Sequence, residues 1–348
     1  MKNILLHQRW TRRQALRFMA GTAAATGLHA CGRAAQTLST PTAENLTSVS
    51  FGITAWIGCA PIYIAEAKNF FQEEGLDLSV RTYSSMAEAF PAFAIGQLQG
   101  MFSAGSEAVL QADQGVDFRI VGVMDTSNGA DVFLARNSVA TINDLRGKRI
   151  GVQKGGLGHF FLLQVLAEVG LSESDVQIVD VSPETAAAAY KAGNVDVAYS
   201  YPPLSDEANA VQTDGRVIYD TSMMPTAIVD LYYFSNEFIV SNPEAVQGFI
   251  NGVFKGLEFL NTNTNEALSI VASRLEIEPQ EVEQQLQGVN LPNLQTNVEM
   301  LSNAQSDLHL VKPLTEISEF LEGQGQIQNT LDITQYIDPQ FVIAANNA

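Results

Sequence analysis

Short apolar runs and longer amphipathic stretches alternate along the chain from about residue 48 onward. The runs are rich in β-branched and aromatic residues, which favours strands, whereas the stretches between them carry apolar residues at helical spacing. In the first half of this series the pattern predicts strands at 48–54, 76–82, 101–104, 118–124 and 132–135, with helices at 61–75, 86–96 and 107–114. Alternating strands and helices are typical of βαβ units, so we expect an α/β fold with mostly parallel sheets.

A second series of the same kind begins near Arg149. It predicts strands at 149–153, 176–181, 195–200, 218–220 and 227–234, with helices at 159–169, 183–192 and 204–210. After Asn242, a favourable N-cap followed by Pro243, the pattern is helical almost to the end of the chain.

The length of this region predicts two lobes. A folded region of about 300 residues is larger than one hydrophobic core usually supports, because single cores rarely grow beyond about 250 residues. We expect the linkers between the lobes near Asn137 and Asn236. Lobe 1 then consists of residues 48–136 and 237–348, and lobe 2 of residues 137–236.

The first 30 residues are basic and contain no acidic residue. Arg12 and Arg13 precede a mild apolar stretch, Met19 to Leu28, which is too short to span a bilayer. A twin arginine followed by a short apolar stretch is typical of a bacterial export signal of the twin-arginine type. We therefore expect residues 1–30 to be a signal peptide; the alternative is the amphipathic N-terminus of a cytoplasmic protein.

The end of this segment predicts a membrane anchor. Leu28 to Cys31 resembles a bacterial lipobox, in which the cysteine carries the lipid, although His29 is an unusual occupant of that motif. Residues 31–47 are small and polar and contain proline, as in a flexible tether. The expected location is the periplasm or the outer face of the plasma membrane, with the protein held by a lipid on Cys31.

The charge and the cysteine and histidine content exclude several kinds of partner and site. Removal of the signal would change the net charge from −19 to −24, because five basic residues and no acidic ones leave with it. So acidic a chain is a poor partner for nucleic acid. Its overall charge does not attract an anionic ligand either, so such a ligand would have to be held by hydrogen-bond donors within the site. Cys59 would have no partner for a disulfide, and with only His159 and His309 left, a metal site of several histidines is excluded.

Three segments resemble one family of binding proteins. They are residues 61–77, 142–152 and 191–198, and they are similar to stretches of the NMT1/THI5-like and SsuA/TauA-like substrate-binding proteins of nitrate/sulfonate/taurine type. The resemblance extends over about residues 48–340. It implies a type II-like periplasmic-binding-protein fold, with two lobes, two crossover segments and a ligand cleft between the lobes. It also implies delivery of the ligand to an ABC permease with its ATPase.

Ligands of open α/β sheets bind outside the carboxyl ends of strands, so we expect site residues in the loops that follow strands. Trp56 follows the first strand and can form a flat apolar wall, although a large aromatic residue can equally belong to the core. Gly105 and Ser106 stand between a strand and a helix. They can offer a backbone N–H group and a hydroxyl to a ligand, or Ser106 can be a simple N-cap.

The loop around Gly155 and Gly156 predicts a cradle for an anion. Glycines between a strand and a helix let backbone N–H groups converge at a helix N-terminus, where the dipole favours negative charge. This is not a Walker loop, because the Gly-Lys-Ser/Thr ending is absent. In the sulfonate-type relatives a histidine occupies the place of His159, which implies a ligand donor or a brace for the loop.

Two more loops supply candidates. The alternating acids and hydroxyls of residues 125–131 suggest a calcium-binding loop, but Arg136 stands where such a loop requires a Glu. A turn near the first crossover is therefore favoured. In that turn Asn128 or Asp131 would either lie near the ligand or support the hinge. Tyr201 stands where many relatives carry Trp followed by an acid. Here Pro202 replaces the acid, which counts against an amino-bearing ligand, and Tyr201 remains a stacking or hydroxyl-donating candidate.

These features together predict a monomeric solute-binding lipoprotein that captures a small organic anion such as an alkanesulfonate by lobe closure, without a cofactor or metal. One alternative cargo is a thiamine-type pyrimidine precursor, for which aromatic walls and carboxylates such as Glu107 or Asp131 would suit better than a glycine cradle. Another alternative is a sensory lipoprotein without a transporter. Catalysis is not expected, because Cys59 has no candidate base beside it in the sequence and the cysteine-rich signature of THI5-like enzymes is missing.

Overall fold

The computed structural model describes residues 46–347, apart from residues 137 and 225–226. The predicted signal peptide, the lipid site at Cys31 and most of the predicted tether lie outside the described residues. Within the described part of the chain, no helix has the length and apolar content needed to cross a membrane.

The first sheet has six strands in the order β11-β4-β10-β3-β1-β2. Its strands are β1 (Thr47–Thr54), β2 (Leu76–Tyr83), β3 (Gly100–Ala104), β4 (Phe118–Ser127), β10 (Val229–Ser235) and β11 (Val289–Asn290). Strand β1 is parallel to β2 and β3, whereas β10 runs antiparallel between β3 and β4 and β11 runs antiparallel to β4. Stacked and tilted rings of Phe51, Phe234 and Phe249 fill the core beneath it.

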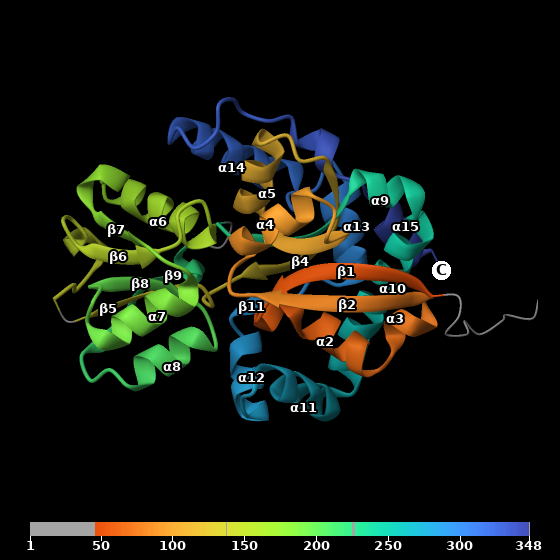
Figure 1. The fold of residues 1–348 in the computed structure, drawn as a ribbon, viewed down its shortest axis with the longest axis horizontal. Helices are drawn as coiled ribbons and strands as arrows, with labels where there is room; N and C mark the ends of the chain where they lie inside the picture. Colours follow the sequence, from red (N-terminus) through yellow and green to blue (C-terminus); the bar gives the residue numbers. More distant parts are fainter. Residues whose placement is uncertain (1–45, 137, 225–226, 348) are drawn as a thin grey trace, which may run out of the picture. The chain divides into compact units, whose positions relative to one another are not determined.

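Helices cover both faces of this sheet (Figure 1). On one face lie α2 (Ala60–Ala67), α3 (Phe70–Glu73) and the long α10 (Pro243–Thr262), and on the other lie α4 (Met86–Ala94), α5 (Gly105–Asp113) and α14 (Val311–Gly323). The remaining helices of this part are α9 (Asn236–Ser241), α11 (Thr264–Leu275), α12 (Pro279–Leu286), α13 (Leu294–Ser302) and α15 (Gln340–Asn346).

The second sheet has five strands in the order β7-β6-β8-β5-β9. They are β5 (Val132–Arg136), β6 (Arg149–Val152), β7 (Gln177–Asp180), β8 (Val197–Ser200) and β9 (Gly215–Asp220), and the helices packed with them are α6 (Leu157–Glu168), α7 (Pro183–Ala192) and α8 (Leu204–Ala210). Strand β6 is parallel to β7 and β8, and β5 is antiparallel to β8 and β9.

The predicted α/β class and its two series of strands are confirmed, with one correction of detail. Most strands of each sheet run in one direction, as expected, and only β10 and β11 in the first sheet and β5 in the second run against them. By strand pairing, β5 belongs to the second sheet and β10 to the first. The chain therefore passes from one sheet to the other between β4 and β5 and again between β9 and β10, not near Asn137 and Asn236.

The predicted helix 61–75 is interrupted. Helix α2 ends at Ala67 and α3 begins at Phe70, and between them Asn69 adopts a left-handed conformation with a φ of 61°. Asparagine tolerates this conformation better than most residues with a side chain, so the break is encoded locally.

Gly256 allows α10 to pack directly on the backbone of α2. A Cβ atom at this position would lie 2.1 Å from the carbonyl oxygen of Pro61. We expect Gly256→Ala to lower the free energy of unfolding by roughly 1–3 kcal/mol, because a backbone atom cannot rotate out of the way. Urea denaturation measures the loss. Gly323→Ala, where a Cβ meets nothing within 4 Å, is the control and should be nearly neutral; equal losses in both variants would contradict this account.

Candidate functional site

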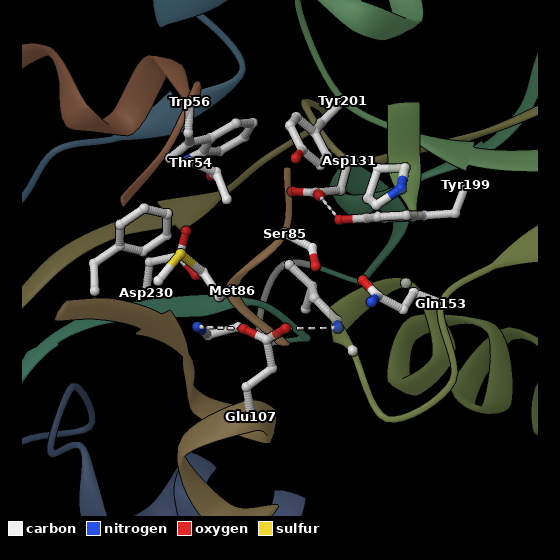
Figure 2. A pocket seen from close by; sticks show the side chains of 16 residues that line it. Thr54, Trp56, Ser85, Met86, Glu107, Asp131, Gln153, Tyr199, Tyr201 and Asp230 are labelled. Carbon is white, nitrogen blue, oxygen red and sulfur yellow. Dashed lines mark hydrogen bonds between the residues drawn. The ribbon is translucent and has the colours of Figure 1, made fainter. Parts of the chain in front are cut away.

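A small cavity lies where loops and strand ends of both sheets come together (Figure 2). Its volume is about 50 Å³. A single water needs roughly 10–15 Å³ of such space, so the cavity has room for a small solute. Its side-chain walls are aromatic or apolar (Trp56, Met86, Phe102, Leu157, Pro183, Tyr199, Tyr201) and polar (Thr54, Ser85, Glu107, Asp131, Gln153, Asp230).

The aromatic wall joins the two sheets. Trp56 follows β1 of the first sheet, and Tyr201 follows β8 of the second. Their rings meet edge to face with centroids 5.6 Å apart, and Tyr199 at the end of β8 continues the wall, 6.0 Å from Tyr201. Such edge-to-face pairs add about 0.5–1.5 kcal/mol to the burial of the rings themselves. The indole Nε1 of Trp56 also donates a 2.9 Å hydrogen bond to Oδ2 of Asp125, which fixes the plane of its ring.

A carboxylate of the protein occupies the helix N-terminus that was predicted to cradle an anion. Glu107 lies in the first turn of α5, and its Oε1 accepts a hydrogen bond of 3.0 Å from the backbone N–H of Leu157, the first residue of α6. Its Oε2 accepts from the Ser103 hydroxyl at 2.8 Å and from the N–H of Ala104 at 3.4 Å. The N–H of Gly155 is also taken, because it donates to His159. Two of the expected anion donors are thus satisfied within the protein.

The glycines of this loop have a packing role as well. A Cβ atom on Gly158 would lie 2.3 Å from Cδ1 of Tyr199, so the start of α6 rests directly on the Tyr199 ring. Gly155 has a positive φ of 76°, which glycine adopts without strain.

Three aspartates gather beside the cavity. Asp125 on β4 and Asp230 on β10 are cross-strand neighbours, and Asp131 lies in the crossover that leads to β5. Asp131 Oδ1 accepts a 2.5 Å hydrogen bond from the Tyr199 hydroxyl. Within the described residues, Oδ1 of Asp125, Oδ2 of Asp131 and Oδ1 of Asp230 are buried without a hydrogen-bond partner. Burying such atoms without a partner costs free energy, so the cluster lowers the stability of the ligand-free protein.

Burial shifts the proton equilibria of this cluster. Desolvation raises the pKa of Asp131 to about 6, and desolvation together with the nearby Asp131 raises the pKa of Asp125 to about 7. The pKa of Asp230 is raised well above its usual range by burial and by the neighbouring acids. Burial also raises the pKa of Glu107, although its hydrogen bonds from Ser103 and the backbone oppose the shift. Neighbouring buried carboxyl groups do not all ionise together, so some carboxyl groups of the ligand-free cavity stay protonated near neutral pH.

The raised pKa values predict that stability falls as the pH rises. In the folded state these carboxyls keep their protons to higher pH than in the unfolded state. For Asp131, burial therefore costs no stability below the usual pKa near 3.8, and the cost grows until the pH has passed the folded pKa. From Asp131 alone, the free energy of unfolding should drop by about 1 kcal/mol between about pH 5 and about pH 8. Urea denaturation at the two pH values measures this drop. The free energy of unfolding should fall less in Asp131→Asn than in the wild type, and as much as in the wild type in Asp77→Asn, a control at an exposed position. An unaltered slope in Asp131→Asn would contradict the shift.

The structure places the candidate residues of the sequence in two groups. Trp56, Asp131, Gly156 and Tyr201 line the cavity. The others do not line it (Gly105, Ser106, Asn128, Gly155, His159).

Each member of the second group has another environment. Gly105 is buried against α14, where a Cβ would lie 2.6 Å from Cδ2 of Leu314. The hydroxyl of Ser106 is buried in α5 without a hydrogen-bond partner among the described residues. Asn128 is exposed in the crossover, and its N–H donates to the carbonyl of Gly288.

His159 braces the glycine loop. Its Nδ1 accepts from the N–H of Gly155 at 3.2 Å, and its Nε2 lies 3.2 Å from Oε2 of Glu173. Burial lowers the pKa of His159, and the neighbouring Glu173 opposes this shift. Of the two roles that the resemblance implied for this residue, the geometry fits the brace.

Sequence reasoning missed several polar residues of the cavity. Asp230 is the main one, and the signal was present: it is a single acid within the otherwise apolar run 227–234. Ser85 and Gln153 follow β2 and β6, and nothing in their local sequence marks them as site residues. Despite its acids, the described part of the chain contains no group of His, Cys, Asp and Glu arranged to hold a metal ion.

Comparison with known proteins identifies similar chains. The model of the family described as NMT1/THI5 like matches residues 56–267, more than half of the chain. The taurine-binding periplasmic protein of Escherichia coli (strain K12) is 26% identical over 298 residues, which are 81% of this chain and 89% of that protein. The riboflavin-binding protein RibY of Chloroflexus aurantiacus is 26% identical over 319 residues, 87% of each chain.

Solved structures show the same fold. The alkanesulfonate-binding protein SsuA from Xanthomonas axonopodis pv. citri, bound to MOPS, aligns with a TM-score of 0.70 at 18% identity, covering 84% of this chain and 98% of that one. The two-lobed fold expected from the sequence is thereby confirmed.

Proposed function

The chain belongs to the NMT1/THI5-like family, and on this basis we propose that it is an exported solute-binding protein that serves an ABC importer. One observation carries the proposal: a small cavity is enclosed by residues of both sheets. Trp56 meets Tyr201 across it, and Glu107 of α5 meets the N-terminus of α6. This arrangement suits capture of a solute by closure of two lobes, in which a ligand that touches both lobes shifts the population towards the closed state.

The lobes in this proposal follow the strand pairing. The lobe with the first sheet contains both ends of the described chain, and the lobe with the second sheet contains β5 to β9. The hinge segments are then the connections between β4 and β5 and between β9 and β10. The permease would recognise the closed form. The twin-arginine signal, the lipid on Cys31 and the monomeric state remain predictions from the sequence.

The proposed cargo is a small organic solute of the sulfonate type. Relatives named for taurine and for aliphatic sulfonates support this class. The riboflavin-binding relative shares a similar span of the chain, but a cavity of about 50 Å³ favours a much smaller solute. An amino-pyrimidine is the second candidate, because aromatic walls and the carboxylates of Glu107 and Asp131 line the cavity.

We propose no catalytic activity. Cys59 is fully buried, and burial together with the nearby Asp125 and Asp230 raises the pKa of its thiol well above the usual value. A thiol in such surroundings is a poor nucleophile. It also does not line the cavity.

A thermal-shift screen of the purified protein tests the function. The panel contains sulfonates, amino-sulfonates, amino-pyrimidines, nitrate and bicarbonate. A ligand at about 100 times its dissociation constant adds roughly 2.7 kcal/mol to stability, which raises the melting temperature by a few degrees. A shift with one class supports the receptor and names the cargo, whereas no shift with any class would contradict uptake of these solutes.

A further inference from the structure

We propose that Asp131 and Asp230 hold the solute as protonated carboxyl groups, which donate hydrogen bonds to its acceptor oxygens. Capture of an anionic solute then takes up a proton from the solvent and weakens as the pH rises. This inference rests on the proposed function, because it concerns how the same cavity holds its solute. It adds a dependence on protons to that function.

The cavity offers no positive charge to an anion. Among the described residues, its titratable lining consists of three acids and two tyrosines (Glu107, Asp131, Asp230, Tyr199, Tyr201). Lys154 and His159, on the adjoining loop, are both paired with Glu173. Ionised carboxylates would repel an anion strongly at the low local dielectric of such a cavity. An anion is therefore held here by hydrogen-bond donors that carry no charge.

Asp131 and Asp230 each have one oxygen free for such a bond. Their side chains are 2% and 3% exposed, and one oxygen of each is buried without a hydrogen-bond partner in the described residues. The hydroxyl of Ser85, which also lines the cavity, is buried without a partner as well. Figure 2 shows all three side chains around the same space. An ionised carboxylate can only accept, whereas a protonated one also donates, so the protonated acids and Ser85 offer three donors.

Tyr199 determines which oxygen of Asp131 carries the proton. Burial and the nearby Asp131 raise the pKa of the Tyr199 hydroxyl, so this hydroxyl keeps its proton and donates to Oδ1 of Asp131 at 2.5 Å. The acceptor in a protonated carboxyl is its carbonyl oxygen, so the proton of Asp131 lies on Oδ2. Oδ2 is the buried oxygen without a partner, and it is therefore the atom that donates to the solute.

Glu107 plays a different part. Its two oxygens already accept three hydrogen bonds, one of them from the N-terminus of α6. Hydrogen bonds of this kind favour the ionised form of a carboxyl group. Glu107 thus has its partners within the protein, and the acids left to hold the solute are Asp131 and Asp230.

The surroundings of the two acids favour their protonated forms. The titratable groups that face one or both of them are other acids, tyrosines and a thiol (Asp125, Glu107, Tyr199, Tyr201, Tyr232, Cys59), and none of these is basic. Desolvation raises the pKa of Asp131 to about 6, and burial with the neighbouring acids raises that of Asp230 well above its usual range. A bound anion opposes ionisation further, so binding takes up protons.

Calorimetric titration with ethanesulfonate tests the inference. This probe stays ionised across the pH range used, so a change of affinity with pH belongs to the protein. We expect binding at about pH 5.5 to be at least about tenfold tighter than at about pH 8, because Asp131 loses its proton over this range. Titrations in buffers of different ionisation enthalpy should show net proton uptake. Asp77→Asn, a control at an exposed position, should retain both effects.

Asp131→Asn gives the sharpest prediction. Asparagine keeps an oxygen for the Tyr199 hydroxyl and offers an N–H donor in place of the carboxyl proton at every pH. We expect this variant to bind ethanesulfonate at about pH 8 at least about tenfold more tightly than the wild type, and to lose most of the pH dependence. A merely structural role of Asp131 would not raise the affinity.

Alanine variants complete the comparison. Asp131→Ala and Asp230→Ala have no donor at these positions, so each should bind ethanesulfonate at about pH 5.5 more weakly than the corresponding asparagine variant. Melting curves at both pH values identify any variant that is not folded under the conditions of the titration. Equal affinities of the folded asparagine and alanine variants would overturn the assignment of the donors.

The outcomes separate this inference from the proposed function. If ethanesulfonate binds equally at both pH values or more tightly at the higher one, the receptor function stands and the inference falls. The same holds if the pH dependence persists in Asp131→Asn, or if another solute of the screen binds and ethanesulfonate does not. If no solute of any class binds at either pH, the proposed function falls, and the inference with it.

Discussion

Replacing Trp56 with alanine should weaken solute binding tenfold or more and lower the free energy of unfolding by roughly 3–5 kcal/mol. The side chain is only 4% exposed, so its removal leaves a cavity as well as a missing wall. It also removes the indole donor of Asp125, which leaves a buried carboxyl without its hydrogen bond. Urea denaturation and calorimetric titration measure the two effects.

Trp56→Phe is the matched control for this prediction. Phenylalanine keeps an aromatic face towards Tyr201 but has no N–H group for Asp125. We expect it to retain most of the affinity and to lose less stability than Trp56→Ala. Unchanged affinity in Trp56→Ala would remove this residue from the binding site, whatever the loss of stability.

Glu107→Ala should lower the free energy of unfolding by roughly 2–4 kcal/mol and favour an open arrangement of the ligand-free protein. The substitution leaves the Ser103 hydroxyl and the N–H groups of Ala104 and Leu157 without their acceptor, and buried donors without a partner cost about 1–3 kcal/mol each. Relief of a buried charge offsets part of this cost. Because the contact with Leu157 joins α5 to α6, its loss should also raise the radius of gyration, which small-angle X-ray scattering measures.

Glu107→Gln separates the contribution of the size of this side chain from that of its two acceptor oxygens. The amide has one oxygen, so it can accept from Leu157 or from Ala104 but not from both. We expect a loss of stability between those of the wild type and Glu107→Ala. A Glu107→Ala variant with the stability and radius of gyration of the wild type would contradict the role of this contact.

Local sequence pattern predicted most of the elements, because the apolar periodicity and the capping residues that form them are local. Helices 183–192 and 204–210 have the predicted bounds, and the first begins at a proline and ends before a glycine with positive φ. The sheet to which β5 and β10 each belong could not be predicted in this way. Both are apolar runs between polar loops, and the choice of sheet depends on pairing with strands far along the chain.

The site was predicted in part for the same reason. Loops that follow strands pointed to Trp56, Gly156 and Tyr201, which line the cavity. The same rule also suggested an anion cradle at the start of α6, and only the fold reveals that Glu107, fifty residues earlier, takes that place. Asp230 was missed because an apolar run identifies a strand but not the face on which its one acid lies.

The burial of Cys59 makes the protein a convenient scaffold for a fluorescent reporter. The thiol is inaccessible, and its raised pKa keeps it from reacting with maleimide-type dyes. In a chain that starts at Ser48 it is also the sole native cysteine. A cysteine introduced at an exposed position such as Val211, which is 64% exposed, would then take up dye at one site. The unreacted Cys59 would then add no background to the signal of that dye.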